Sequence, residues 1–228
     1  MILECRALNK TFVNKKAVTD FNMKLQEGKI YGLLGENGSG KTTWMKMVAG
    51  LTKPSSGDII FQGHTWNYHD KSSIAYMSTE PFFYDFMTIE DIGQYYEDFF
   101  EDFNRKKYQK LIQRVGLSEN LKTRNLSTGM SAKLKVVATL SRNSSLYLLD
   151  EPLNGIDYKA REEIVSIILE EAVENNCFVI STHLIEEVES FIDEAIFVKN
   201  GKILLQTELE HERRANGKSI SDIYMEIM

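Results

Sequence analysis

The sequence predicts an α/β protein in which strands of a parallel sheet alternate with helices. Short apolar runs bounded by turn residues recur along the 228-residue chain, and segments with helical periodicity separate several of them. A helical stretch of roughly fifty residues, from 88 to 141, interrupts this alternation. We find no internal repeat and no linker long enough to separate independent domains, so one continuous unit is expected.

The first third of the chain is expected to consist mainly of strands. Glu27–Gly28 predicts a turn between two of them. A helix over residues 42–51 should follow, because Trp44 and Val48 belong to its apolar side and Gly50 lies near its end. The strands expected here are residues 2–8, 17–25, 29–34, 58–62 and 73–77.

The second half of the chain returns to strands after the helical stretch. Between two of them, residues 161–172 predict a helix, since Ile164, Ile167 and Ile168 share one face. The last two strands should form a hairpin around Asn200–Gly201. The strands expected in this part are residues 146–149, 177–181, 194–199 and 202–206.

The composition excludes several classes of protein. Hydrophobic residues make up 43% of the chain and charged residues 26%, as in ordinary globular proteins. The formal net charge of −6 leaves no broad basic surface, so we expect no nucleic-acid partner. No apolar stretch approaches the roughly 18 residues of a membrane-spanning helix, and no signal-peptide pattern follows Met1. Cys5 and Cys177 lie far apart, which indicates reduced, buried thiols.

A phosphate-binding loop follows the third expected strand. Residues 35–42 fit GxxxxGK[ST], directly after an apolar strand and directly before a helix. Its backbone N–H groups and the helix N-terminus would surround phosphate oxygens. Lys41 would reach the β- and γ-phosphates, and the Thr42 hydroxyl would hold Mg²⁺. The nucleotide-binding candidates here are Gly35, Glu36, Asn37, Gly38, Ser39, Gly40, Lys41, Thr42 and Thr43.

Two adjacent carboxylates end the apolar strand at 146–149. Asp150 is expected beside the phosphate loop, where it would contact Mg²⁺ directly or through water. Glu151 would polarise a water molecule for attack on the γ-phosphate. Upstream, Ser127 precedes a helical segment as an N-cap, which predicts a second helix terminus able to bind an anion.

With these motifs, nearly the whole chain resembles the nucleotide-binding subunit of an ABC transporter. Residues 127–130 resemble the signature LSGGQ, with Thr128 for the first glycine and Met130 for the glutamine. Residues 152–157 are similar to the D-loop, which ends at Asp157, and His183 matches the switch histidine.

The resemblance implies roles for further residues. Ser127 and Gly129 would contact the γ-phosphate, and His183 would assist both that phosphate and the general base. Phe12 occupies the position of the aromatic side chain that stacks on adenine in this family. Thr79 stands where the family has the glutamine of the Q-loop, so it is a candidate Mg²⁺ ligand by position only. The adjacent Glu80 is the alternative at this place, since its carboxylate could reach Mg²⁺ through water.

The resemblance also implies an architecture and partners. Residues 1–228 would form a single cassette: a P-loop NTPase core with a RecA-like parallel sheet and an N-terminal antiparallel β-subdomain (about 1–86 and 145–228), and a helical subdomain (about 87–144). Two cassettes, identical or different, would bind ATP and Mg²⁺ between them. Separate membrane permease subunits would form the pore and hold the chain on the cytoplasmic face of the cell membrane.

The residues around 127–130 and 217–224 resemble the bacitracin- and antibiotic-type export ATPases. This likeness implies export of a peptide, an antimicrobial or a lipid-like compound. One alternative is a non-transport ATPase that acts as a mechanical or regulatory dimer, although Lys41 and Asp150 lie too close for the long coiled coil of the DNA-repair relatives. A small-molecule kinase is the other, but a kinase would not need Asp157 or His183.

Overall fold

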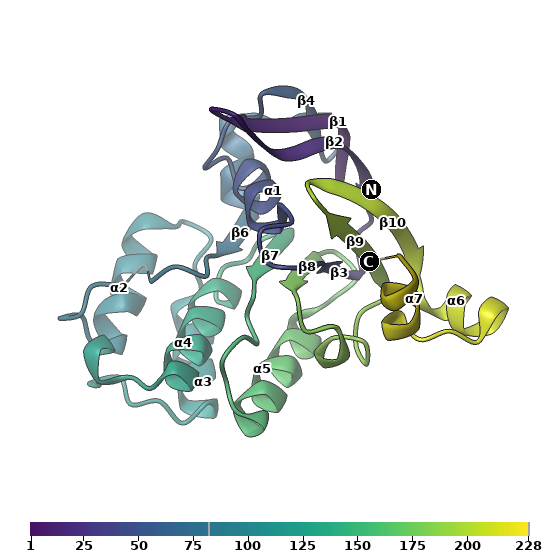
Figure 1. Cartoon of the computed structure of the whole chain (residues 1–228). Coiled ribbons are helices and arrows are strands. Elements are labelled where there is room, and N and C mark those ends of the chain that lie inside the picture. The colour runs from purple at the N-terminus through teal and green to yellow at the C-terminus, as the bar shows by residue number, and fades with distance from the viewer. Residues whose placement is uncertain (82, 228) are drawn as a thin grey trace.

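A six-stranded sheet forms the centre of the molecule in the computed structural model, which describes residues 1–81 and 83–227 (Figure 1). The strand order is β10-β9-β3-β8-β7-β6, and all neighbours are parallel except β10 and β9. The strands are β3 (Ile30–Leu34), β6 (Ile74–Met77), β7 (Leu146–Asp150), β8 (Cys177–Thr182), β9 (Glu194–Lys199) and β10 (Lys202–Glu208).

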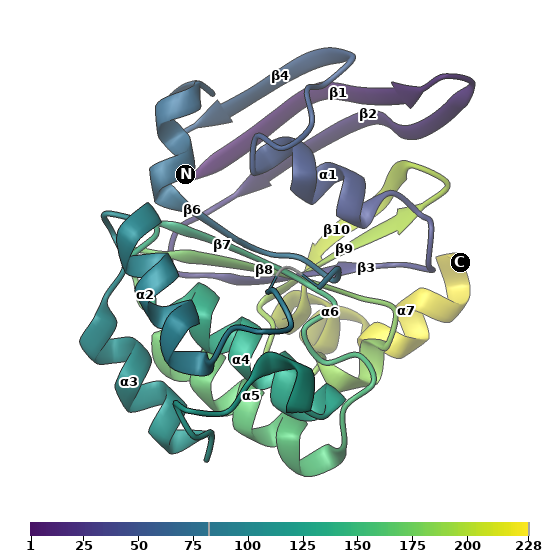
Figure 2. The ribbon, with the colours of Figure 1, turned by 90° about the vertical axis from the view of Figure 1, so that its left-hand side faces the viewer.

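A second, antiparallel sheet packs over one face of the central sheet. Its strand order is β2-β1-β4-β5. Figure 2 shows α1 (Lys41–Val48) lying between the two sheets. The strands of this second sheet are β1 (Leu3–Phe12), β2 (Lys15–Leu25), β4 (Ser56–Phe61) and β5 (His64–Thr65).

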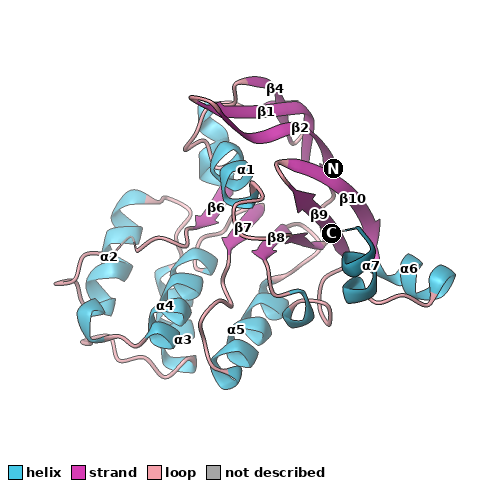
Figure 3. Cartoon of the chain, viewed as in Figure 1, coloured by secondary structure: helices cyan, strands magenta, loops and turns pink. Residues whose placement is uncertain are grey.

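Helices cover the opposite face of the central sheet (Figure 3). Two short helices, α6 and α7, are the last elements of the described chain. The helices are α2 (Ile89–Phe99), α3 (Arg105–Arg114), α4 (Thr128–Leu140), α5 (Tyr158–Glu171), α6 (Leu209–Asn216) and α7 (Ile220–Ile227). Three 3-10 turns accompany them: η1 (Tyr68–Ser73), η2 (Thr123–Asn125) and η3 (Ile185–Glu187).

Two apolar cores lie on the two faces of the central sheet. In the core under the antiparallel sheet, α1 contributes the fully buried Trp44 and Met45. The other core joins the sheet to α2, α3, α4 and α5. Alternate residues of β7 serve the two cores, Leu148 the first and Leu149 the second, as the period of two of a strand requires.

Polar N-caps determine where the main helices begin. Thr88, Asn104, Ser127 and Asp157 each accept a hydrogen bond from a backbone N–H three residues further on. Such caps satisfy N–H groups that have no partner within the helix. Two of these caps, Ser127 and Asp157, are also residues that the sequence singles out for nucleotide binding.

The prediction of an α/β protein is confirmed, and all the expected strands are present with small changes at their ends. The helix expected over 42–51 ends earlier, at Val48, because Gly50 adopts a φ of 67° that closes it. The helix expected from 161 begins at Tyr158, directly after its Asp157 cap. The expectations did not include α6 and α7, and the division into a core and a helical subdomain stays a prediction.

Arg142 joins the helical segment to the edge of the central sheet. Its guanidinium is buried and donates from Nε to both carboxylate oxygens of Asp102, at 3.0 and 3.1 Å. It also donates to the carbonyl oxygens of Ile74 (2.9 Å) and Ser72 (2.9 Å) and lies over the Phe100 ring. A planar group with five donors can hold these separate acceptors in fixed positions.

We expect Arg142→Met to lower the free energy of unfolding by about 3–5 kcal/mol, because the Asp102 carboxylate would lose its ion-pair partner in a largely buried place. Urea denaturation of the purified chain measures this change. Arg114→Met is the control, since it removes an exposed ion pair with Glu170. Equal small losses in the two variants would contradict this role of Arg142.

Candidate nucleotide-binding site

The register of three parallel strands brings the candidate residues to one edge of the sheet. Leu34 at the end of β3 pairs with Thr182 at the end of β8, and Asp150 at the end of β7 pairs with Ser181. The segments that follow these strands therefore start side by side. They contain the phosphate loop, Glu151 and His183, which agrees with the rule that ligands bind at the carboxyl ends of parallel strands.

The glycines of the loop allow the backbone to pass close to neighbouring strands. A Cβ atom on Gly35 would lie 2.1 Å from the Val198 carbonyl oxygen. A Cβ on Gly40 would lie 2.4 Å from the Ala17 carbonyl oxygen, and the φ of Gly40 is +113°. These contacts require glycine at both positions. The loop is thus held between the central and antiparallel sheets, with its helix α1 directly behind it.

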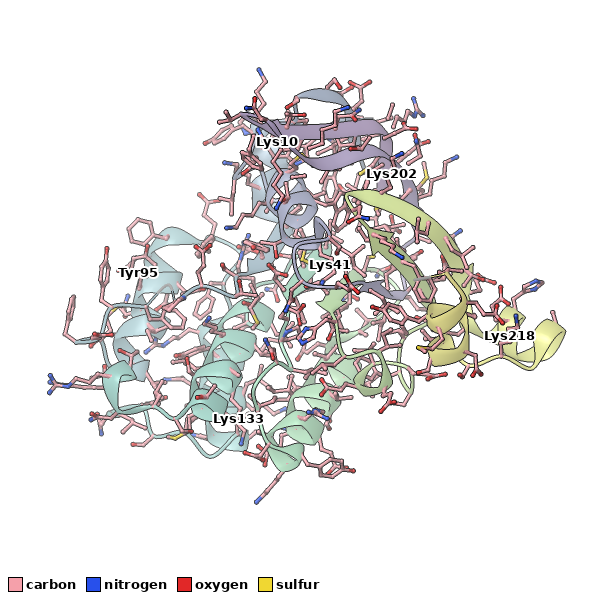
Figure 4. The ribbon with its side chains drawn as sticks, viewed as in Figure 1. Lys10, Lys41, Tyr95, Lys133, Lys202 and Lys218 are labelled. Carbon is pink, nitrogen blue, oxygen red and sulfur yellow. The ribbon has the colours of Figure 1, made fainter. Side chains whose placement is uncertain are left out.

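Lys41, the first residue of α1, is buried within the loop, and Figure 4 shows it in the interior of the molecule. Its Nζ atom donates to the carbonyl oxygens of Gly35 (2.6 Å) and Glu36 (3.1 Å). The same atom lies 3.4 Å from Glu151 Oε1. Burial lowers the pKa of Lys41, while the nearby carboxylates of Glu151 and Asp150 act in the opposite direction. The site therefore combines a cation with the carboxylates of Asp150, the last residue of β7, and of Glu151, which follows it.

Asp150 is fully buried, and hydroxyl groups hold both its oxygens. Ser181 Oγ donates to Oδ1 at 2.5 Å, and Tyr76 OH donates to Oδ2 at 3.3 Å. Burial, and then the charge of Asp150, raises the pKa of Tyr76, so its hydroxyl stays protonated as a donor. The sequence alone predicts no role for Tyr76 or Ser181. Both lie in strands that neighbour β7, Tyr76 in β6 and Ser181 in β8, and this placement could have indicated contact with Asp150.

Glu151 and His183 meet directly. Glu151 Oε2 lies 2.9 Å from His183 Nδ1. The other oxygen, Oε1, is buried and accepts no hydrogen bond in the described part of the chain. The backbone of Glu151 has a φ of +50°, and its N–H donates to Ser181, which fixes the turn after β7. The carboxylate thus has one oxygen oriented by His183 and a second beside Lys41, and such a carboxylate can accept a proton from water.

Some of residues 127–130, called the signature-like residues here, lie beside the carboxylates of Asp150 and Glu151. Ser127, Asp150 and Glu151 contribute to a cavity of about 360 Å³. None of the loop residues 35–42 contributes to its walls. Gly129 lies near the D-loop position, since a Cβ atom there would be 3.8 Å from Asp157 Oδ2. Within one chain, the structure therefore brings the signature-like residues to the carboxylates but does not place them in one cavity with the phosphate loop.

The remaining candidates lie at the border of this region. Phe12, at the end of β1, is 47% exposed, and Lys10 Nζ lies 4.8 Å from its ring centre. Its ring is thus available for contacts and is not part of a core. Thr42 and Thr43 are half-buried in the first turn of α1. Thr79 is exposed and also borders the cavity that Ser127 lines.

The chain is similar in sequence to the ATP-binding proteins of ABC transporters. The profile of the family described as ABC transporter matches residues 18–154. The lantibiotic transport ATP-binding protein SrtF of Streptococcus pyogenes is 31% identical, over 92% of this chain and 92% of that protein. The bacitracin transport ATP-binding protein BcrA of Bacillus licheniformis is 30% identical, over 95% of this chain and 73% of that protein.

Solved structures share the fold. The ATP binding subunit of an ABC transporter superposes with a TM-score of 0.88 at 23% identity, over 100% of this chain and 99% of that chain. A dimeric structure of the cassette MJ0796 bound to ADP and Pi gives a TM-score of 0.81 at 20% identity, over 91% of this chain and 99% of that chain. This likeness confirms the predicted P-loop NTPase core.

The fold and the loop at its sheet edge define an ATPase of the P-loop class. The family match and the curated relatives then show that the chain belongs to the ABC transporter family, as an ATP-binding subunit. Its activity is ATP hydrolysis coupled to transport, as the resemblance implied. ATP-binding subunits of this family pair with membrane permeases, and the solved MJ0796 cassette is dimeric. In the described chain, no helix is both long and apolar enough to cross a membrane.

We expect Ser181→Ala to lower the free energy of unfolding by about 1–3 kcal/mol, because the Ser181 hydroxyl makes two hydrogen bonds that alanine cannot make. Buried Asp150 would lose the hydroxyl donor to its Oδ1, and the backbone N–H of Glu151 would lose one of its acceptors. Thermal or urea unfolding measures the loss. Ser72→Ala, which removes an exposed hydroxyl that donates to a backbone carbonyl, is the control and should have a much smaller effect. If the two variants were equally stable, the buried network around Asp150 would not have the importance assigned to it.

Proposed function

We propose that this chain binds Mg-ATP at the phosphate loop, hydrolyses it between two cassettes, and thereby drives export of a compound through separate membrane subunits. One observation carries the proposal. Glu151 contacts both Lys41 and His183 at one sheet edge, although the three residues follow three different strands, while Ser127 lines a cavity to which no residue of the phosphate loop contributes. Lys41, Glu151 and His183 would carry out hydrolysis. The separate position of Ser127 supports the proposal that another chain completes the site.

The phosphate loop would bind the triphosphate through its backbone N–H groups and Lys41. Since Lys41 Nζ already lies against carbonyl oxygens and Glu151, phosphate oxygens would take over part of its donor capacity. Ser39 supports this assignment, because its buried hydroxyl has no hydrogen-bond partner among the described residues. Phe12 would stack on the adenine ring, which its exposure permits.

The residues at the sheet edge fit a magnesium ion. Mg²⁺ prefers hard oxygen ligands, and Asp150 supplies a carboxylate held in place by Ser181 and Tyr76. Thr42 would add a hydroxyl, with Thr79 as a further candidate. When bound, Mg²⁺ would neutralise charge that develops on the phosphate oxygens.

Glu151 would act as the general base. Its Oε1 atom is the acceptor for a proton of the attacking water, and His183 Nδ1 holds Oε2 in a fixed orientation. Lys41 Nζ lies 3.4 Å from Oε1, so the base and the phosphate-binding cation are neighbours. In this arrangement, His183 contributes by orienting the base and by approaching the γ-phosphate.

The second cassette would supply Ser127, Gly129 and Asp157. Ser127 and Asp157 are helix N-caps, and helix N-termini favour negative charge. ATP would bridge two chains, and loss of the γ-phosphate would release them, so nucleotide state would control association.

For the cargo, we infer a peptide, an antimicrobial or a lipid-like compound. The curated relatives include proteins named for lantibiotic transport and bacitracin transport. The partners would be multi-span permease subunits and a second cassette, identical or different. Through the permease, the chain would sit on the cytoplasmic face of the cell membrane.

We expect Glu151→Gln to lower ATP turnover by roughly 10²–10⁴-fold, because glutamine cannot accept the proton of the attacking water. ATP binding should persist, since Lys41, Thr42 and Asp150 are unchanged. The ATP-bound pair should then accumulate, and size-exclusion chromatography with ATP and Mg²⁺ should show a shift from monomer to dimer.

Two controls accompany this measurement. ADP should not produce the dimer, because it lacks the γ-phosphate. Ser127→Arg in the Glu151→Gln background should abolish it, because arginine would fill the space of that phosphate. A Glu151→Gln chain that hydrolyses ATP at the wild-type rate would contradict the mechanism.

A further inference from the structure

The loop formed by residues 78–80, which follows β6 beside the site, is held by one side chain of α4. Lys135 Nζ lies within hydrogen-bond distance of three consecutive carbonyl oxygens: Ser78 (3.3 Å), Thr79 (2.9 Å) and Glu80 (2.9 Å). A lysine ammonium has three N–H donors and no acceptor. Three backbone carbonyls therefore match the donor capacity of this group, and its charge strengthens each bond.

The position of Lys135 links this loop to the reaction site. The loop starts next to the carboxylate strand, because Met77, the last residue of β6, pairs with Leu149 of β7. Lys135 also lines the 360 Å³ cavity to which Asp150 and Glu151 contribute. A lysine in this half-buried place is thus close to the reacting groups as well as to the loop.

The opposite side of the loop has a weaker attachment. Lys46 of α1 lies 3.0 Å from Glu80 Oε1, but the Glu80 side chain is 71% exposed, so this pair is screened by water. Lys135 binds main-chain atoms, whose positions define the loop itself. Residues 78–80 are therefore attached on one side to α1 and on the other to α4, the helix that carries the signature-like residues and is called the signature helix below. The attachment through Lys135 is the firmer of the two.

We propose that Lys135 is a positioning residue for ATP hydrolysis: its ammonium group fixes residues 78–80, and with them Thr79, relative to Asp150, Glu151 and the signature helix α4. The inference rests on the proposed function. Because Lys135 belongs to α4, movement of the signature helix carries the ammonium with it. The loop beside the carboxylates then follows that helix.

The fold does not depend on this contact. Thr79 and Glu80 are exposed, so water can replace the ammonium as donor to their carbonyls. Loss of Lys135 would release the loop, and of the three carbonyls that of half-buried Ser78, which has the longest bond at 3.3 Å, is the least open to water. In catalysis, in contrast, a shift of about 1 Å in a positioned group can cost roughly 10²-fold in rate. We therefore expect loss of Lys135 to lower ATP turnover more than the free energy of unfolding.

The test compares Lys135→Met with Lys133→Met in the full chain. Methionine keeps an unbranched side chain but has no N–H donor. Lys133 lies on the same helix and pairs with Glu163 of α5, so its variant removes a charge from α4 without changing the attachment of the loop. Figure 4 labels Lys133 on α4. Hydrogen–deuterium exchange over residues 77–81 and steady-state ATPase kinetics are measured for both variants.

For Lys135→Met we expect faster exchange over residues 77–81 and a kcat lowered by about tenfold, with the KM for ATP at the wild-type value because Lys41 is unchanged. Lys133→Met should leave the exchange, kcat and KM unchanged. Lys135→Arg should recover part of the lost kcat, since a guanidinium can donate to two of the carbonyls.

Three results would overturn the inference. They are an unchanged exchange rate in Lys135→Met, an unchanged kcat in that variant, and an equal fall of kcat in Lys133→Met. In each of these cases the wild-type chain hydrolyses ATP, and the proposed function stands. A wild-type chain that binds and hydrolyses no ATP would instead overturn the proposed function, and this inference with it.

Discussion

The parallel register of β3, β7 and β8 is the constraint on which the site depends. Because Leu34 pairs with Thr182 and Asp150 with Ser181, three chain segments leave the sheet at the same edge. Two apolar cores hold the sheet from both faces and so keep this register fixed. A shift of one residue in any of these strands would exchange the two faces of that strand and separate the charged groups.

Burial of opposite charges gives the site its chemical character. Lys41 and Glu151 are both largely withdrawn from water, so each stabilises the charge of the other, and His183 orients the carboxylate. Groups in such a place respond strongly to an added phosphate, because that phosphate competes for the same cation. Nucleotide binding would therefore redistribute hydrogen bonds that the chain already makes, and the attachment of loop 78–80 by Lys135 extends this network to α4.

Much of the fold and the site follows from local sequence patterns. The loop at 35–42 and the carboxylates after β7 could be predicted because each motif is continuous and lies next to an apolar strand. Tyr76 and Lys135 could not, since their roles depend on side chains distant in the sequence: Asp150 for one and the backbone of residues 78–80 for the other. The helix α6 has few apolar residues, so its sequence carries little helical periodicity. The helix α7 was not predicted, although Ile220, Ile223 and Ile227 recur at helical spacing and could have indicated it.

The central claim is that the edge formed by β3, β7 and β8 binds ATP through Lys41. An equilibrium titration of ATP in the presence of Mg²⁺ tests it most directly, with wild-type chain and Lys41→Ala compared after circular dichroism has shown both to be folded. We predict that Lys41→Ala loses most of the affinity, because the fixed cation of the phosphate loop is removed. An unchanged affinity for ATP in Lys41→Ala would contradict the account.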